Sequence, residues 1–223
     1  MVRLNSGNFT FSQAQSDGRD IRFSTAAGAA LSYQIEQWDA INTSAAVWVK
    51  IPTITGNARQ EIRMYWGKSD AVSESNGAAV FNVANGYASV LHLNETVADV
   101  VGNTTPTDVG TTLATGMIGK GRNFTAGKGI LVGNNLTTFP TGSNPHSSEV
   151  WFRSGVAGTN ILGWGNEQGQ GKVVMQYVSP PHINMDCYFG GGNVSGTSTL
   201  SASQWVHVAH TYTEESLGWN TLI

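Results

Sequence analysis

A tryptophan in the second half of the chain has the surroundings of a sugar-binding residue. Trp164 stands between two glycines, whereas a tryptophan packed in a core seldom needs a glycine on each side. Aromatic rings offer a large apolar face on which the C–H face of a sugar can stack. Asn166 and Gln168 could hydrogen-bond to sugar hydroxyl groups, and Tyr188 beside a glycine-rich run is a second aromatic candidate. We therefore predict a ligand site at Trp164, Asn166, Gln168 and Tyr188; the alternative is that Trp164 packs at one end of a β-sandwich.

A predicted turn at residues 98–103 brings together the oxygen ligands that calcium takes. Asp99 supplies a carboxylate and Asn103 a side-chain carbonyl, and both are hard oxygen donors. The alternative is an Asx turn, in which Asp99 accepts hydrogen bonds from its own backbone and needs no ion. Calcium at Asp99 and Asn103 is the one cofactor that the sequence suggests.

Acidic residues near the N-terminus have two interpretations. Asp17, Asp20 and Glu36 could form a calcium or ligand site. The interpretation we prefer is a turn followed by a partly buried ion pair that fixes the register of a strand, in which Arg22 pairs with Asp20 or Glu36.

No catalytic constellation is found in the sequence. His207 and His210 are three residues apart on a predicted strand, so they point to opposite faces and cannot chelate one metal together. His146 follows Pro145 and is expected in an exposed loop. A nucleophile elbow, a phosphate-binding loop and a zinc-protease motif are absent. We predict that the protein is not an enzyme.

The charge and composition exclude several classes of partner. Charged residues make up 12% of the chain and the net charge is −3. Because no basic run exists, nucleic acid and anionic membranes are poor candidates as partners. No apolar stretch is long enough to span a membrane. Cys187 is the only cysteine, so neither an internal disulfide nor a cysteine metal site can form.

Alternating apolar and polar residues predict short β-strands, and helical periodicity is nearly absent. Turn signals rich in Gly and Asn separate the strands. Within them, Trp151 and Trp205 are expected to fill a core. The predicted strands are residues 47–51, 62–66, 89–93, 149–153, 173–177 and 206–210. The predicted fold class is all-β, with two abutting antiparallel β-sandwiches.

Residues 1–84 resemble a bacterial family of unknown function, the domain-of-unknown-function family 2341. The resemblance covers four ordered blocks, at residues 17–23, 31–38, 47–52 and 62–67. The family has no assigned activity, so the resemblance implies a context only: secreted and envelope proteins with lectin-like neighbours.

The second segment resembles the laminin-G-like and concanavalin-A-like lectin/glucanase superfamily. The blocks that carry this resemblance are Leu91–Glu95, Gly119–Phe124, Glu149–Arg153 and Trp205–Tyr212. It implies a jelly-roll sandwich, and some members bind calcium at their loops. Members normally continue with more strands after the last block, whereas residues 213–223 depart from that pattern. We therefore expect an incomplete sandwich, with exposed edge strands through which the chain could dimerise.

These observations predict two domains and a binding function. The domains are residues 1–84, a partial sandwich, and residues 86–223, an incomplete laminin-G-like domain. We expect a non-catalytic module of a larger secreted or envelope bacterial protein, located outside the cell or in the envelope. Its expected partner is a polysaccharide, a glycoconjugate or a cell-surface protein. The alternatives are a structural or adhesion spacer without a small ligand, and an accessory fragment of a glycan-active enzyme.

Overall fold

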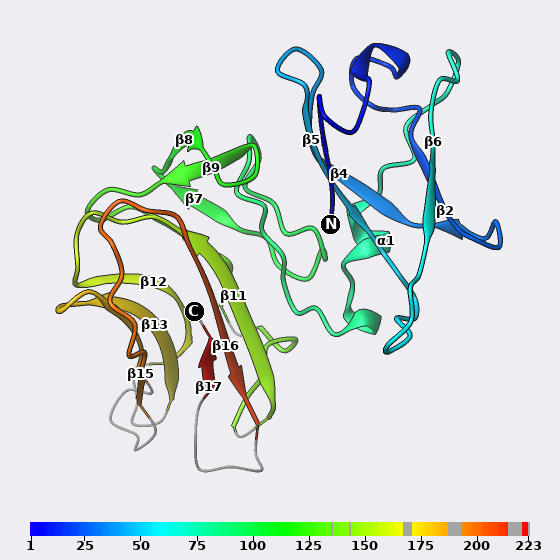
Figure 1. Ribbon diagram of the computed structural model, residues 1–223. Helices are drawn as coiled ribbons and strands as arrows, with labels where there is room; N and C mark the ends of the chain where they lie inside the picture. The colour runs from blue at the N-terminus through cyan, green and yellow to red at the C-terminus, as the bar shows by residue number, and fades with distance from the viewer. Residues whose placement is uncertain (135, 143, 167–170, 187–192, 214–219, 223) are drawn as a thin grey trace. The chain divides into compact units, whose positions relative to one another are not determined.

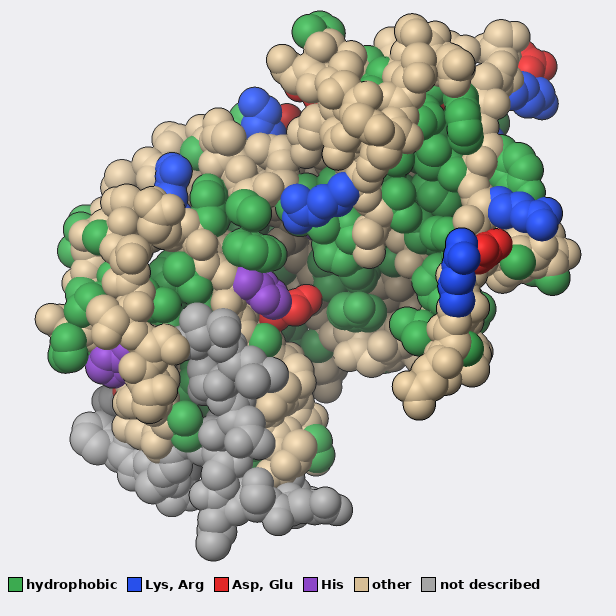
Figure 2. Space-filling model, in the orientation of Figure 1, with side chains coloured by type: hydrophobic (Ala, Val, Ile, Leu, Met, Phe, Trp, Pro, Cys, Tyr) green, Lys and Arg blue, Asp and Glu red, His purple; other side chains and the backbone are tan. Residues whose placement is uncertain are grey.

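The computed structural model describes residues 1–134, 136–142, 144–166, 171–186, 193–213 and 220–222 (Figure 1 and, in space-filling form, Figure 2). Contacts within the chain divide it into two compact units, Met1–Thr138 and Phe139–Ile223. In both units the regular structure is almost all β, so the prediction of an all-β chain is confirmed.

The first unit contains two three-stranded antiparallel sheets. One has the order β1-β5-β4, with β1 at Val2–Asn5, β5 at Ser44–Val49 and β4 at Tyr33–Asp39. The other has the order β3-β2-β6, with β3 at Ala30–Leu31, β2 at Arg22–Thr25 and β6 at Ile62–Tyr65.

A shared hydrophobic core holds these two sheets face to face. Phe23 of β2 is buried in the same cluster as Tyr33 of β4 and Val47 of β5, and Met64 of β6 packs against it. Alternation in β2 turns Phe23 inward and Arg22 outward, because successive strand residues point to opposite faces. A second cluster around Phe9 and other aromatic side chains continues this core.

Short elements complete the first unit. They are η1 (Phe11–Gln13), α1 (Gly77–Val80), η2 (Val83–Asn85) and the strand pairs β7 (Thr107–Val109) with β10 (Gly129–Leu131) and β8 (Thr112–Thr115) with β9 (Lys120–Asn123). The Asn76 side chain accepts a hydrogen bond from the Ala79 N–H at 3.1 Å and so caps α1. The strand predicted at residues 89–93 is wrong, because this segment is irregular and Leu93 has a φ of 57°.

The second unit also contains two antiparallel sheets. One has the order β11-β16-β17, with β11 at His146–Phe152, β16 at Val206–Tyr212 and β17 at Asn220–Leu222. The other has the order β12-β13-β14-β15, with β12 at Thr159–Gly165, β13 at Lys172–Val178, β14 at His182–Asp186 and β15 at Val194–Ser195.

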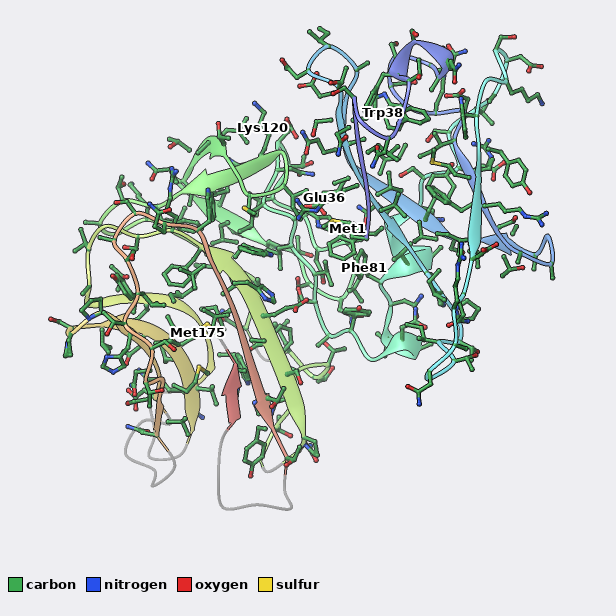
Figure 3. All side chains as sticks on the ribbon, in the orientation of Figure 1. Met1, Glu36, Trp38, Phe81, Lys120 and Met175 are labelled. Carbon is green, nitrogen blue, oxygen red and sulfur yellow. The ribbon has the colours of Figure 1, made fainter. Side chains whose placement is uncertain are left out.

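Side chains from both of these sheets form one core. Met175 of β13, labelled in Figure 3, and Met185 of β14 are fully buried together with Val208 of β16. Val150 and Phe152 of β11 pack against the same cluster. The second unit is thus a two-layer β-sandwich, as expected for sheets that each carry one apolar face.

The contact division differs from the predicted domain boundary. Residues 86–138 group with the first unit rather than with the second. One reason is His92, whose ring lies beside the Glu36 carboxylate of β4. The domains at residues 1–84 and 86–223 remain a prediction. No helix in the described part of the chain is long and apolar enough to cross a membrane.

Candidate functional site

Two of the four predicted ligand residues lie in the described part of the chain. Trp164 in β12 is half-buried, and its ring lies 5.2 Å from the His146 ring and 6.5 Å from the Phe139 ring. Asn166 is exposed and its N–H donates to the Gly171 carbonyl oxygen at 2.8 Å. Gln168 and Tyr188 lie outside the described residues, so the predicted set remains a prediction.

Glycines flank Trp164 because neighbouring backbone atoms leave no room for a side chain at either position. A Cβ at Gly165, where φ is +102°, would lie 2.1 Å from the Gly171 oxygen, and one at Gly163 would lie 2.9 Å from the Val173 oxygen. Side chains at these two positions would collide with the neighbouring strand β13. The glycine pair therefore indicates close strand pairing and is no argument that Trp164 is exposed.

The structure corrects the predicted position of His146. It begins β11 and is half-buried, with its Nδ1 2.9 Å from the Asn144 carbonyl oxygen, and it does not lie in an exposed loop. Its ring is 5.5 Å from the ring of His210, which is fully buried. Burial, and secondarily the nearby His146, lowers the pKa of His210 to about 4. His207 points to the opposite face, as the alternation predicts.

The outer face of β11 and β16 carries a tryptophan that was predicted in the core. Val150 and Phe152 face the core, so alternation turns Trp151 outward, where it is 40% exposed. Trp151 stands opposite His207 across the strand pair, with the two ring centres 4.9 Å apart and the ring planes at 32°. The prediction that Trp151 fills the core is wrong.

Charged side chains flank this aromatic pair. The Glu149 Oε2 lies 3.3 Å from the His207 Nε2, and the Arg153 guanidinium lies 5.2 Å from the centre of the Trp205 ring. Trp205 is half-buried. We call Glu149, Trp151, Arg153, Trp205 and His207 the Trp151 face. Its signal was in the sequence, because charged residues two positions on either side of Trp151 mark an outward-facing strand position.

Asp99 has the surroundings of an Asx turn. Its Oδ1 accepts hydrogen bonds from the backbone N–H groups of Val90 and Val101, at 2.9 and 3.1 Å. Its Oδ2 accepts from the N–H groups of Asn103 and Thr104 and from the Thr104 hydroxyl, at 3.0 to 3.1 Å. The Asn103 amide donates to the Ala88 oxygen at 3.0 Å. A calcium ion at Asp99 would have to displace some of these donors.

No group of three or more His, Cys, Asp or Glu side chains that could hold a metal ion occurs among the described residues. The calcium site at Asp99 and Asn103 remains a prediction.

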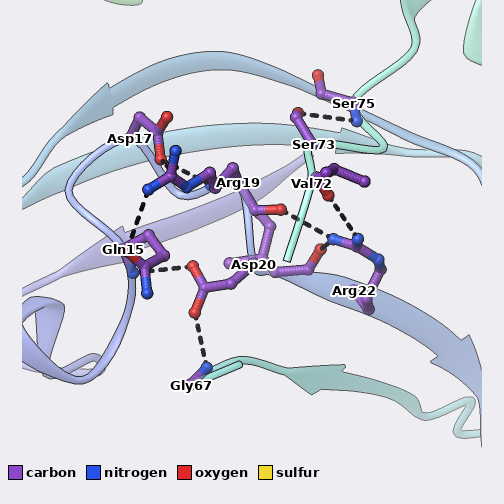
Figure 4. A network of polar contacts seen from close by, with 10 residues as sticks. Gln15, Asp17, Arg19, Asp20, Arg22, Gly67, Val72, Ser73 and Ser75 are labelled. Carbon is purple, nitrogen blue, oxygen red and sulfur yellow. Dashed lines mark hydrogen bonds and ion pairs between the residues drawn. The ribbon is translucent and has the colours of Figure 1, made fainter. Parts of the chain in front are cut away.

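Asp17 and Asp20 have separate hydrogen-bond partners (Figure 4), and the Asp17 Oδ1 accepts a hydrogen bond from the Arg19 N–H at 3.2 Å. Asp20 is buried and accepts hydrogen bonds from the N–H groups of Gln15 and Gly67 at 2.8 and 2.7 Å. Arg22 pairs with Glu74 at 3.0 Å, rather than with Asp20 or Glu36, and donates to the Val72 oxygen at 2.7 Å. These two residues therefore join β2 to the segment at residues 67–74.

An open cavity of about 360 Å³ adjoins this network in the first unit. Its walls include Asp20, Arg22, Tyr65, Trp66 and Lys68. Tyr65 is 48% exposed, and the pKa of its hydroxyl is lowered by hydrogen bonds from Ser24 and Arg63. The Asp20 and Arg22 side chains in the cavity wall hydrogen-bond to backbone groups of the protein, and these bonds hold the wall in place.

A nearly buried polar cluster in the first unit was missed by the sequence analysis. The Glu36 carboxylate lies 3.4 Å from the His92 Nδ1 and accepts a hydrogen bond from the Trp48 indole. The His92 Nε2 lies 3.0 Å from the Gln34 Oε1. Its members come from β4, β5 and an irregular segment, so no sequence spacing could have revealed it. Because the Glu36 and His92 side chains are only 8% and 9% exposed, the cluster fixes the packing rather than offering a surface.

Comparison with known proteins finds a family model that matches part of the first unit. Residues 17–90 match the model of the family described as "Domain of unknown function (DUF2341)", which confirms the resemblance found at the N-terminal blocks. No curated protein matches the chain, and no solved structure matches it. The laminin-G-like assignment of the second segment remains a prediction.

Proposed function

We propose that the protein is a non-catalytic carbohydrate-recognition module of a larger secreted or envelope protein, and that its second unit is a concanavalin-A-like sandwich. The observation that carries the proposal is the Trp151 face, an exposed aromatic pair on the outer side of a β-sheet. Its partner would be a polysaccharide or a glycoconjugate outside the cell or in the envelope.

The chemistry of the Trp151 face suits a sugar. A sugar ring presents an apolar C–H face that can cover the exposed part of Trp151, which removes aromatic surface from water. Glu149 can accept hydrogen bonds from sugar hydroxyl groups and Arg153 can donate them. Large aromatic side chains with polar neighbours are also typical of protein interfaces, so a cell-surface protein is the alternative partner.

A binding screen with matched variants tests this proposal. Wild type, Trp151→Ala, Trp164→Ala and Phe124→Ala are compared on a glycan array and on insoluble polysaccharides, with calcium and with EDTA. Phe124 is the matched control, because it is an aromatic residue of similar exposure, at 49%, in the first unit. Circular dichroism first establishes that each variant is folded. We expect Trp151→Ala to weaken binding by about tenfold or more, as loss of a central aromatic contact does.

Each other outcome favours a different function. If only Trp164→Ala abolishes binding, the ligand site predicted at Trp164 is correct and the Trp151 face is not the site. Binding that disappears in EDTA would support calcium near Asp99. If folded wild type binds no glycan, the structural or adhesion spacer replaces the proposed function. Hydrolysis of a bound glycan would contradict the prediction that the protein is not an enzyme.

A further inference from the structure

Within the described part of the chain, the Trp151 face carries well-exposed side chains on the outer side of its sheet. Trp151 is 40% exposed, and the side chains of Glu149 and His207 are 70% and 40% exposed. Sites for small molecules are concave and bury most of the ligand surface. On this face one ring could cover Trp151 on one side only, so a monosaccharide would gain little free energy.

The length of the face suits several rings in a row. Glu149, Trp151 and Arg153 occupy alternate positions and are exposed on one side of the strand. At about 3.4 Å per residue, an extended chain from Glu149 to Arg153 spans roughly 14 Å. If one sugar ring stacks on Trp151, the adjacent rings of the same polysaccharide can reach Glu149 on one side and Arg153 on the other.

The charges of the face favour a neutral ligand. Glu149 and Arg153 carry opposite charges at the two ends, so neither an acidic nor a basic polymer gains net attraction. The Arg153 guanidinium already lies over the Trp205 ring, which holds it in place as a hydrogen-bond donor.

The alignment of these groups points to a ligand class. We propose that the Trp151 face binds a neutral, extended β-1,4-linked polysaccharide chain along β11, with one ring on Trp151 and flanking rings hydrogen-bonded to Glu149 and Arg153. This linkage gives a flat, extended chain that can follow a strand, whereas an α-linked chain coils away from a flat surface. The inference rests on the proposed function and specifies its ligand.

Titration calorimetry with oligosaccharides of one to six rings tests the inference on the full chain. The β-linked probes are cello-, xylo- and manno-oligosaccharides, and the comparison probes are malto-oligosaccharides and oligogalacturonate. For at least one β-linked series we expect affinity to rise about tenfold or more from one ring to three and then to level off. Trp151→Ala should remove this binding, and Phe124→Ala should leave it unchanged.

Substitutions at the two ends test the direction of the chain. Glu149→Gln and Arg153→Gln should each weaken binding of the three-ring probe several-fold, because each removes one charge-assisted hydrogen bond. Binding of the β-linked probes that is insensitive to both changes would overturn the inference.

The inference and the proposed function fail in different ways. Trp151-dependent binding of monosaccharides, malto-oligosaccharides or oligogalacturonate in preference to the β-linked series would overturn the inference and leave carbohydrate recognition standing. Absence of binding to every glycan, by folded wild type, would remove both.

Discussion

Asp99 orders its turn by accepting hydrogen bonds from four backbone N–H groups and one hydroxyl. Removal of the carboxylate in Asp99→Ala leaves these half-buried donors without their acceptor. We expect the variant to lose about 2 to 3 kcal/mol of unfolding free energy, measured by urea denaturation. Asp99→Asn retains one side-chain oxygen and should lose less.

A control and a calcium titration separate the two interpretations of Asp99. Asp70→Ala is the control, because Asp70 is exposed and its contact with Lys68 is a 3.7 Å surface ion pair. If the carboxylate serves the turn alone, millimolar calcium should leave the melting temperature of wild type unchanged. A rise in melting temperature with calcium, lost in Asp99→Asn, would instead establish the predicted metal site.

Whether a residue's role could be predicted depended on how close its partners lie in the sequence. The Asx turn at Asp99 was one of the two interpretations that the sequence offered, because Val101, Asn103 and Thr104 lie within five residues of it. Trp151 was misplaced because tryptophan was assumed to be buried, although the charged residues two positions away on both sides argued otherwise. The contact between His92 and Glu36 joins residues far apart in the chain, and no local pattern encodes it.

At the scale of elements, two glycines allow the close approach of β12 and β13. Gly165→Ala would place a Cβ 2.1 Å from the Gly171 oxygen at a φ of +102°, a conformation that alanine rarely adopts. We expect a loss of about 2 kcal/mol or more in unfolding free energy. Gly129→Ala is the matched control, because Gly129 is also in a strand and a Cβ there would have no neighbour within 4 Å. Equal stability of the two variants would contradict this strand geometry.

Strands that place several apolar side chains in one core were predictable, and the irregular segment at residues 89–93 was not. The predicted strands at residues 149–153, 173–177 and 206–210 overlap β11, β13 and β16, and each contributes apolar side chains to the same core. Residues 89–93 were also predicted as a strand but form none. There, the Val90 N–H donates to the Asp99 side chain rather than to a neighbouring strand.

At the scale of the whole molecule, composition and alternation predicted the all-β fold class, and the sequence blocks predicted the family match at residues 17–90. The grouping of residues 86–138 with the first unit rests on contacts between residues far apart in the sequence. Residues 86–138 form two separate two-stranded sheets, in which β7 pairs with β10 and β8 pairs with β9. The contacts of His92 and of Gly77, whose Cβ would lie 2.9 Å from the Gln34 side chain, bring parts of this unit onto β4. Such contacts between distant residues depend on packing.

The stability of the protein should fall in weak acid because His210 is buried. The pKa of His210 is lowered to about 4 in the fold, whereas an unfolded histidine titrates near 6.5. The unfolded chain therefore binds a proton first, so unfolding free energy is lost as pH falls from about 6.5 toward 4, by up to roughly 3 kcal/mol. His210→Gln cannot titrate and should show a shallower loss than wild type between pH 7 and pH 5, measured by urea denaturation followed by tryptophan fluorescence. Val208→Ala is the control, because Val208 is buried on the same strand face and its loss should lower stability equally at every pH. If His210→Gln and wild type lose stability in parallel, the proton is not taken up at His210.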